Sequence, residues 1–485
     1  MRETLPPSVS GFVPLSDVSV LDPPEDVLTT LHADGRRKWM YPTESRGNLW
    51  RKRLVLGWAL IVLFVGPPLV KIGGKPAVLL DVAAREFTFF GTTFYPTDTL
   101  YLMLFGISAL LSVALLTALL GRVWCGWGCP QTVYLEFVFR PIERLIEGNE
   151  NVRQRRDARK DPTWDRLWRK GLKWAVYLAI SVALAHVFVS YFVGWERLVR
   201  WMTGPPAEHW GYFVLMGATT ALVAFDFGIF REQMCTITCP YARFQSVLMD
   251  PDSMIVAYDP GRGEPRGRGK NREAGPDGQP LGDCVDCFAC VRTCPTGIDI
   301  RDGLQMECVA CTQCIDACDH IMDATNQPRG LIRYTSENAL EGQPTRIVRP
   351  RTAIYGALLV ALVTLLGTGL ATRGSYDTDI GRAVGAPFME LPDGTVANRL
   401  RVRVHNQTPK DATFTVEAVS PSGAQTRLVG RPPVRLAAGQ MTRAEAWITV
   451  PPEAFSGGTV PTVIRLTFED GTTEDLPFTL LGPTR

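Results

Sequence analysis

Five long runs of apolar residues, separated by polar stretches, dominate the pattern along the 485-residue chain. A helix needs about 20 residues, and about 17 at the short end, to cross the hydrocarbon core of a bilayer. The second, third and fifth runs reach this length without a charged residue, whereas the first ends early in Pro67-Pro68 and the fourth contains Asp226. Helices buried in a soluble core rarely stay uncharged for so long, so the pattern predicts five membrane spans. They lie at Leu54–Val70, Leu100–Gly121, Trp174–Val193, Trp210–Phe230 and Thr352–Thr372.

The Lys and Arg residues near the ends of these runs predict their orientation. Residues 33–53 contain seven and the 122–173 loop contains twelve, while the 71–98 loop contains three and the 194–209 loop two. The N-terminus and the cysteine-bearing loops are therefore expected in the cytoplasm, and the tail after the last span outside it. The N-terminal stretch lacks the apolar segment of a signal peptide, so the first span is expected to direct the chain to the membrane.

The C-terminal tail predicts an all-β domain over residues 390–485. Leu400, Val402 and Val404 alternate with polar residues, and this period of two is typical of half-buried strands. Pro, Gly and Asn residues separate further strand-like runs at the spacing of a small immunoglobulin-like sandwich. No cysteine or catalytic cluster occurs there, so a partner-docking module is expected.

Cysteine usage adds chemistry to this picture. All twelve cysteines lie between Cys125 and Cys318, in a chain whose formal net charge is only +2. That charge favours neither a nucleic-acid partner nor an acidic substrate. Clustered cysteines favour metal–thiolate chemistry in a reducing compartment over a disulfide framework.

Eight of the cysteines form two runs with the same spacing, C-x2-C-x2-C-x3-C, which is typical of a ferredoxin with two 4Fe-4S clusters. Three cysteines of each run fit on one tight loop, and the fourth lies beyond that loop and serves the other cluster. Structural zinc sites instead join two C-x2-C halves across a longer gap, so zinc is the weaker alternative. His320 is expected to be a neighbouring or surface residue, not a ligand. The predicted ligand sets are Cys284, Cys287, Cys290 and Cys318 for one cluster, and Cys308, Cys311, Cys314 and Cys294 for the other.

The other four cysteines form two C-x3-C-P turns, each after the cytoplasmic end of a span. The shared pattern predicts a weak internal repeat of two helix hairpins that pack side by side. Proline disfavours helix at the second cysteine and suits the first turn of the next helix. The thiolates would be soft ligands for Cu(I) or a thiol–disulfide couple, and the alternative is that these cysteines only pack. The candidate catalytic, copper-binding residues are Cys125, Cys129, Cys235 and Cys239.

Two polar residues fall inside predicted spans, where polar groups are costly and often functional. His186 lies mid-span, and a packed histidine and a contact to a cofactor or quinol remain equal alternatives. Asp226 lies near the cytoplasmic end of its span and is a weak candidate for a proton or metal contact near Cys235.

The sequence thus predicts an integral membrane α-helical protein with a cytoplasmic ferredoxin-like domain and a C-terminal immunoglobulin-like domain. A stretch dense in Gly, Pro and Arg is expected to be a solvated linker. The predicted parts are an N-terminal segment at 1–53, a four-helix membrane region at 54–258, the linker at 259–282, the ferredoxin-like domain at 283–330, the fifth span at 352–372 and the β-domain at 390–485.

The C-W-G-C-P-Q-T-V turn, the C-T-x-x-C-P-Y-A-R-F-Q turn, the R-G-E-P-R-G linker and the paired ferredoxin motifs together resemble the CcoG (FixG/RdxA) family. The resemblance covers nearly the whole chain. It implies an accessory protein of cbb-type cytochrome c oxidase in the bacterial inner membrane, acting as a cupric reductase that turns Cu(II), its substrate, into Cu(I).

The resemblance also implies oxidase assembly factors and a copper transporter or chaperone as partners, besides membrane lipid. The electron donor is unknown, no nucleic acid is expected, and homo-oligomer formation is left open. Two other classes also stay open: a quinol-linked membrane polyferredoxin that transfers electrons, and a non-catalytic scaffold for oxidase assembly. The sequence contains no Rossmann fingerprint, P-loop or c-type haem motif.

Overall fold

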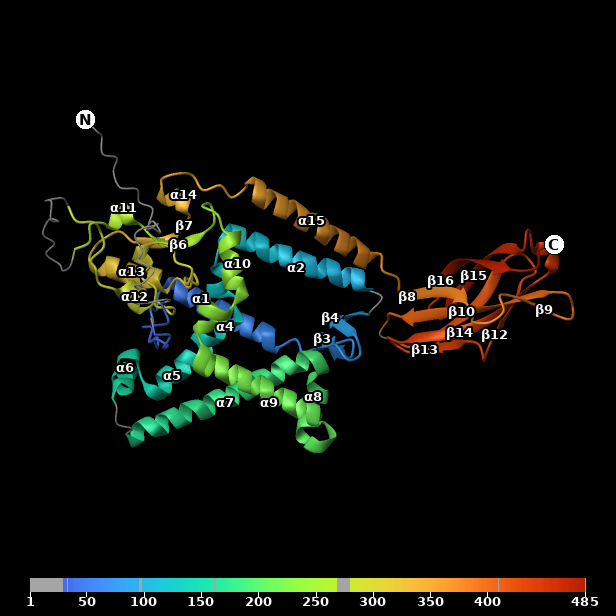
Figure 1. The fold of residues 1–485 in the computed structure, drawn as a ribbon, viewed down its shortest axis with the longest axis horizontal. Helices are drawn as coiled ribbons and strands as arrows, with labels where there is room; N and C mark the ends of the chain where they lie inside the picture. The colour runs from blue at the N-terminus through green and yellow to red at the C-terminus, as the bar shows by residue number, and fades with distance from the viewer. Residues whose placement is uncertain are drawn as a thin grey trace. The chain divides into compact units, whose positions relative to one another are not determined.

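The computed structural model describes residues 29–32, 34–95, 98–159, 163–267, 280–408 and 410–484. The chain forms two compact units. The first unit comprises Met1–Phe90 and Pro96–Thr364, and the second comprises Gly91–Tyr95 and Leu365–Arg485 (Figure 1).

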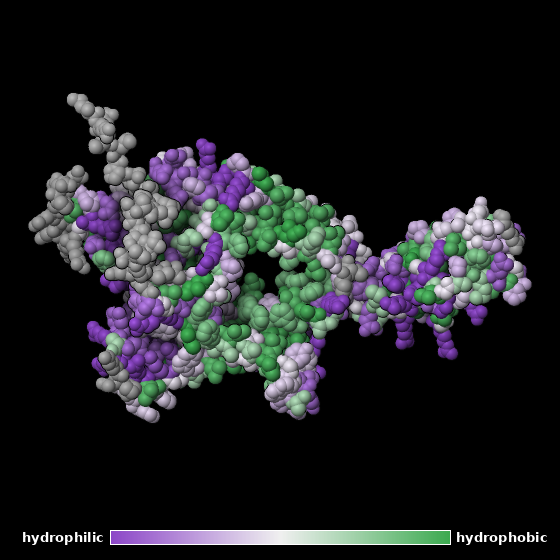
Figure 2. Space-filling view, in the orientation of Figure 1, coloured by the Kyte–Doolittle hydropathy of each residue, from purple (hydrophilic) through white to green (hydrophobic). Residues whose placement is uncertain are grey.

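Four helices are long and apolar enough to cross a membrane: α2 (Thr99–Leu120), α7 (Trp164–Val193), α9 with its extension η4 (Trp210–Phe230), and α15 (Pro350–Ala371). Their outer surfaces leave large apolar side chains exposed, and Figure 2 shows these gathered along the helices and polar side chains gathered over the cysteine-rich end. The apolar window of α15 is 0% buried. Such surfaces are stable only against lipid or other apolar partners.

The predicted first span forms helix α1 (Asn48–Val65), but the prediction of five spans is not confirmed. The helix starts six residues earlier than the apolar run, so its first turns carry the charged side chains of Arg51, Lys52 and Arg53. Only about 12 apolar residues follow, which rise roughly 18 Å. The end of α1 nevertheless lies beside the end of α7, where Tyr191 donates a hydrogen bond to the Phe64 carbonyl (2.6 Å).

Short strands and helices connect the long ones. Strands β3 and β4 pair antiparallel after α1, and β3 packs against α7. The strands are β1 (Lys71–Ile72), β2 (Lys75–Pro76), β3 (Val78–Asp81), β4 (Glu86–Phe89) and β5 (Thr92–Phe94), and the shorter helices are α3 (Val123–Trp127), α4 (Pro130–Tyr134), η2 (Leu135–Phe139), α5 (Arg140–Glu147), α6 (Glu150–Ala158), α8 (Trp195–Thr203), η3 (Pro206–Glu208), η5 (Met234–Thr238) and α10 (Pro240–Leu248).

The ferredoxin-like region is larger than predicted. Strand β6 (Ile255–Tyr258), expected in the membrane region, pairs antiparallel with β7 (Ile332–Thr335), and this ribbon flanks the cysteine loops. Val256, Tyr258 and Ile332 are buried in one core with cysteines of both runs, which explains why the region needs the ribbon. The helices here are α11 (Pro260–Gly263), α12 (Ala289–Arg292), η6 (Ile300–Asp302), α13 (Gln313–Ala324) and α14 (Glu337–Leu340).

The predicted linker at 259–282 is in part ordered structure. Asp259 caps α11 by accepting a hydrogen bond from the Arg262 backbone N–H (3.2 Å), and the Arg262 side chain forms an ion pair with Asp283 (2.5 Å). Residues 268–279 of the linker, like residues 1–28 of the predicted N-terminal segment, lie outside the described residues.

The second unit is a β-sandwich, as predicted. One sheet has the order β12-β14-β10-β8 with β9 beside β10, and the other has the order β13-β11-β15-β16. Leu400, Val402, Val404, Phe414 and Val416 all point into the shared core, so the period of two was interpreted correctly. The strands are β8 (Tyr376–Arg382), β9 (Met389–Glu390), β10 (Val396–Asn406), β11 (Ala412–Ser420), β12 (Gln425–Leu428), β13 (Val434–Leu436), β14 (Met441–Val450), β15 (Thr459–Phe468) and β16 (Thr473–Leu481), with η7 (Pro452–Ala454).

Two features of the sandwich differ from the expectation. Strand β8 lies before residue 390, so the sheet begins earlier than the predicted domain. His405 occupies a polar position of the alternation but is buried, because Tyr95 covers it with a ring-centre distance of 4.1 Å. A segment far away in the sequence therefore covers this side of the sheet.

Candidate iron–sulfur cavities and cysteine turns

Two adjoining cavities lie in the ferredoxin-like region, and each is lined by cysteines of both runs. The Cys284 cavity is lined by Cys284, Cys287, Cys290 and Cys318. The Cys308 cavity is lined by Cys308, Cys311, Cys314 and Cys294, and also by Cys290. The last cysteine of each run thus enters the cavity of the other run, which is the grouping that the spacing predicts.

The two loops repeat one unusual backbone conformation. The residues on either side of the middle cysteine have positive φ: Asp286 and Phe288 in one loop (49° and 56°), Ala310 and Thr312 in the other (50° and 63°). Non-glycine residues rarely adopt this conformation, and it persists only where the surroundings require it. Here it turns backbone N–H groups inward, so that the N–H of Ala310 approaches the Cys308 sulfur at 3.5 Å.

The chemistry of these cavities fits 4Fe-4S clusters. Four sulfurs around one cavity match four cluster corners, and inward N–H groups stabilise thiolates bound to iron. Burial raises the pKa of Cys308 to about 11 and the pKa of Cys318 to about 12. In the cofactor-free chain these thiols therefore keep their protons, and cluster binding must release them.

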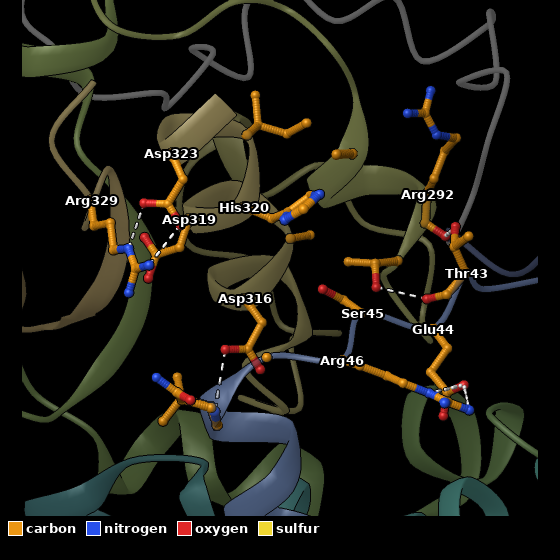
Figure 3. A pocket seen from close by; sticks show the side chains of 17 residues that line it. Thr43, Glu44, Ser45, Arg46, Arg292, Asp316, Asp319, His320, Asp323 and Arg329 are labelled. Carbon is orange, nitrogen blue, oxygen red and sulfur yellow. Dashed lines mark hydrogen bonds and ion pairs between the residues drawn. The ribbon is translucent and has the colours of Figure 1, made fainter. Parts of the chain in front are cut away.

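A larger pocket, with a volume of about 550 Å³, lies next to the Cys284 cavity. Asp316, Asp319, His320 and Asp323 of α13 form one wall, and residues 43–46 with Arg292 face them (Figure 3). The pocket and the cavity share two wall residues, Ala289 and Ile321. A molecule in the pocket would be separated from the cavity by a single layer of side chains.

The two C-x3-C-P turns, Cys125–Pro130 (the first turn) and Cys235–Pro240 (the second turn), have one backbone design. Each follows a residue with positive φ that ends the span, Gly121 (56°) before the first turn and Arg231 (52°) before the second. In each turn the second cysteine is extended and donates its N–H to the carbonyl five residues earlier, at 2.8 Å. The following proline begins the next helix, as predicted. The weak sequence repeat is therefore a structural repeat.

Each turn is also attached to the span of the other repeat. Gln131, two residues after the first turn's second cysteine, donates to the Asp226 carboxylate (3.1 Å) at the end of the second repeat's span. Tyr241, at the matching position, shares a hydrogen bond with Thr117 (2.9 Å) at the end of the first repeat's span. These two reciprocal hydrogen bonds join the two turns at the ends of the spans.

The four turn cysteines consequently lie near one another. Burial raises the pKa of the Cys235 thiol, and the neighbouring Cys129, Cys125, Cys239 and Asp226 raise it further. Cys125 donates a hydrogen bond to the buried Gln245 of α10 (3.4 Å). Within the described residues, however, no three His, Cys, Asp or Glu side chains converge closely enough to hold one metal ion.

The first turn packs directly on the loop of the Cys308 cavity. A Cβ on Gly126 would lie 2.6 Å from the Val309 carbonyl oxygen and 2.7 Å from that of Ala310, so only glycine permits this approach. The Trp127 indole donates to the Tyr334 hydroxyl (2.9 Å) of β7. The first turn is thus in direct contact with the loop of the Cys308 cavity.

A buried ionic network supports the second turn, and the sequence analysis missed it. Arg231 pairs with Glu143 (3.0 Å), and Arg153 and Lys173 also approach that carboxylate (3.3 and 3.6 Å). Burial alone would raise the pKa of Glu143, but these cations lower it to about 2. The basic residues of the 122–173 loop were used only to predict the orientation of the spans. The Glu residues interspersed among them could have indicated ion pairs.

Two histidines lie outside the predicted ligand sets. The Nδ1 atom of His186 lies 2.8 Å from the Val182 carbonyl of its own helix, which favours the packed alternative. His320 lines the large pocket and neither cluster cavity, as expected of a residue that is not a ligand.

Three family models match the chain. Residues 230–337 match a 4Fe-4S dicluster domain, residues 102–149 match a 4Fe-4S binding domain, and residues 366–483 match the IG-like fold at the C-terminal of FixG. The first two matches include the second and the first cysteine turn, respectively.

Protein RdxA of Cereibacter sphaeroides is 36% identical over 408 residues, which are 81% of this chain and 84% of that protein. Nitrogen fixation protein FixG of Rhizobium meliloti is 31% identical over 467 residues, or 87% and 88% of the two chains. A crystal structure of a FixG-related protein from Vibrio parahaemolyticus covers 23% of this chain and 98% of its own, at 12% identity and a TM-score of 0.19, too low to support an argument.

Fold, cavities and family models together define an iron–sulfur oxidoreductase of electron transport with apolar helices suited to a membrane. The chain belongs to the FixG/RdxA family, since its relatives RdxA and FixG match it over most of its length.

Proposed function

We propose that the protein is a cupric reductase, which passes electrons from its clusters to Cu(II) at the two cysteine turns. The proposal rests on one observation above all: four thiols from two linked turns lie near one another, and the first of these turns packs on the loop of the Cys308 cavity. Soft thiolate ligands stabilise Cu(I) over Cu(II), so binding at the turns favours the reduction.

Each Cu(II) accepts one electron, which the clusters supply when they are bound. Two thiolates can hold Cu(I), so the four cysteines do not need to converge on one ion, and in the described residues they do not. Asp226 adds negative charge beside Cys129 and Cys235 and would attract the cation.

The test is copper-dependent oxidation of the dithionite-reduced protein, followed by the iron–sulfur absorbance. Cys129→Ser and Cys239→Ser should keep the full iron content but lose this oxidation, while Thr238→Ala, a neighbour in the second turn, should behave as the unchanged protein. Loss of iron in both cysteine variants would assign the turns to cluster chemistry. Clusters that Cu(II) leaves reduced, but a quinone oxidises, would instead support the quinol-linked alternative.

We further propose that Cu(I) is passed to the assembly of a cbb-type cytochrome c oxidase through a copper transporter or chaperone. Cells with Cys239→Ser should lack assembled oxidase and regain part of it with added copper. Normal assembly without added copper would contradict this role.

Sidedness is the last part of the proposal. We place the clusters and the N-terminus in the cytoplasm of a bacterial inner membrane and the β-sandwich in the periplasm, because basic residues flank the cysteine-bearing loops. An alkaline phosphatase fusion should be inactive after Gly282 and active after Gly374. The reverse pattern would invert the electron path.

A further inference from the structure

The two cluster cavities differ in the charge that surrounds them. Each has a buried arginine beside it: Arg301 at the Cys284 cavity, and Arg53 of α1 near the Cys308 cavity. The difference lies in what neutralises these cations.

Arg301 is neutralised by carboxylates. Its side chain is only 4% exposed, but it pairs with Asp286 (2.6 Å) and with Asp299 (2.5 Å), and Nε also donates to Asp299 (2.8 Å). Two negative charges this close offset the field of the guanidinium at the cavity.

Arg53 has no such partner. The residue is 1% exposed, its Nε donates to the Gly126 carbonyl of the first turn (2.9 Å), and Nη1 and Nη2 make no hydrogen bond to any described residue. No carboxylate in the described part of the chain forms an ion pair with it. Its charge acts on Cys311, a predicted ligand.

Arg122 adds a second cation on the same side. It is 6% exposed, and its donors reach the backbone carbonyls of Met306, Cys308 (3.3 Å) and Ala242 (3.1 Å) and the neutral Met306 sulfur (3.8 Å). Carbonyls solvate a guanidinium but do not cancel its charge. Within the described residues, the Cys308 cavity is therefore flanked by two buried positive charges without a paired carboxylate.

A buried charge without a counter-ion costs several kcal/mol, so an anion is expected beside these arginines. A cluster held by four thiolates is such an anion, and reduction adds one more negative charge to it. A fixed cation therefore stabilises the reduced form and raises the reduction potential, and burial limits screening by salt.

We infer that Arg53, together with Arg122, raises the potential of the cluster in the Cys308 cavity above that of the cluster in the Cys284 cavity. An electron that enters the protein then comes to rest next to the first turn. Arg53 is a positioning residue: its hydrogen bond goes to the Gly126 backbone carbonyl, and its charge decides which cluster holds the electron. The inference requires the two clusters but not copper, so it can fail or hold independently of the proposed function.

The test is a potentiometric titration of the purified full-length protein, followed by electron paramagnetic resonance. Two midpoint potentials should appear. In protein carrying one electron, the cluster in the Cys308 cavity should be reduced at least tenfold more often than the cluster in the Cys284 cavity. A tenfold preference corresponds to about 59 mV between two one-electron couples. Arg53→Met should lower the higher midpoint enough to reduce this preference at least tenfold, whereas Arg53→Lys, which keeps the charge, should restore most of it.

Arg301→Met is the matched control, because it unpairs Asp286 and Asp299 and should lower the other midpoint. Replacing buried ionic groups by well-packed apolar residues of similar volume is often neutral or stabilising, so iron retention in Arg53→Met is expected. If Arg53→Met nevertheless loses iron, Arg122→Met decides, and it should lower the same higher midpoint. The decisive variant is Arg53→Met or, if that loses iron, Arg122→Met. The inference is overturned if this variant leaves both midpoint potentials unchanged. It is also overturned if the variant lowers the same midpoint potential as Arg301→Met.

Discussion

The ferredoxin loops and the cysteine turns are both internal repeats, and both exchange side chains between their two halves. In the ferredoxin loops the exchanged residues are cysteines: Cys294 and Cys318 enter the cavity of the opposite run. In the turns the exchanged residues are Gln131 and Tyr241, which bond to the opposite span.

On the proposed function, this difference would separate a permanent cofactor site from an exchangeable one. Where the ligands themselves cross over, each cluster links two segments of the chain, and its loss removes part of the fold. Where other side chains cross over, the two turns stay joined without a metal, and under the proposed function their thiols are left to bind and release copper. Three variants of this chain test the contrast, in decreasing order of effect.

Cys287→Ser should have the largest effect. Cys287 lines only the Cys284 cavity, but both cavities share one core, so we expect at least half of the iron and acid-labile sulfide to be lost. Two 4Fe-4S clusters predict about eight of each per chain before the change. Iron and sulfide analysis measures the effect, and full occupancy in the variant would refute the ligand assignment.

Gly126→Ala should move the first cysteine turn away from the loop of the Cys308 cavity while leaving the cysteines of both in place. Its Cβ would overlap the carbonyls of Val309 and Ala310, so the first turn has to move away from the cluster loop at a cost of about 1–3 kcal/mol. Stopped-flow absorbance should show slower oxidation of the clusters by Cu(II) at unchanged iron content. Gly217→Ala, where the new Cβ meets nothing within 4 Å, is the control. An unchanged rate would mean that the turn contact carries no electrons.

Tyr241→Phe should have the smallest effect. It removes one hydroxyl hydrogen bond to Thr117 and should lower the free energy of unfolding by about 0.5–1.5 kcal/mol, with iron and copper chemistry intact. Thermal unfolding in detergent measures it against Tyr212→Phe, whose hydroxyl makes no hydrogen bond to any described residue. Loss of copper oxidation in Tyr241→Phe would show that the interlock itself positions the thiols.

The sequence predicts this molecule best where residues close together in the chain determine the local structure. Cysteines at fixed intervals on a tight loop permit few arrangements, so the crossing of Cys294 and Cys318 follows from spacing alone. The strand at Leu400–Val404 was equally clear, because alternation has only one interpretation when one face is buried.

Prediction fails where the partner lies far away in the chain. His405 stands on the polar side of β10, where the alternation predicts exposure. The ring of Tyr95 instead covers it in the fold. Arg53 was counted as one of seven cytoplasmic cations, whereas the fold buries it beneath the first turn. The local sequence does not distinguish a solvated arginine from a buried one, because the loop that covers the buried one is distant in the chain.

The start of α1 also depends on a distant part of the chain, and this dependence has a consequence during synthesis. The backbone N–H groups of Leu49 and Trp50 donate to the Asp316 carboxylate of α13 (3.2 and 2.7 Å), and these partners are 267 and 266 residues apart. At roughly 5–20 residues per second of synthesis, the first helix waits on the order of 10–50 seconds for its acceptor. Until Asp316 has been made and its helix folded, that end of α1 has no protein partner for these amides. Completion of the ferredoxin region therefore also completes the first helix, and a ribosome that stalls in between leaves both unfinished.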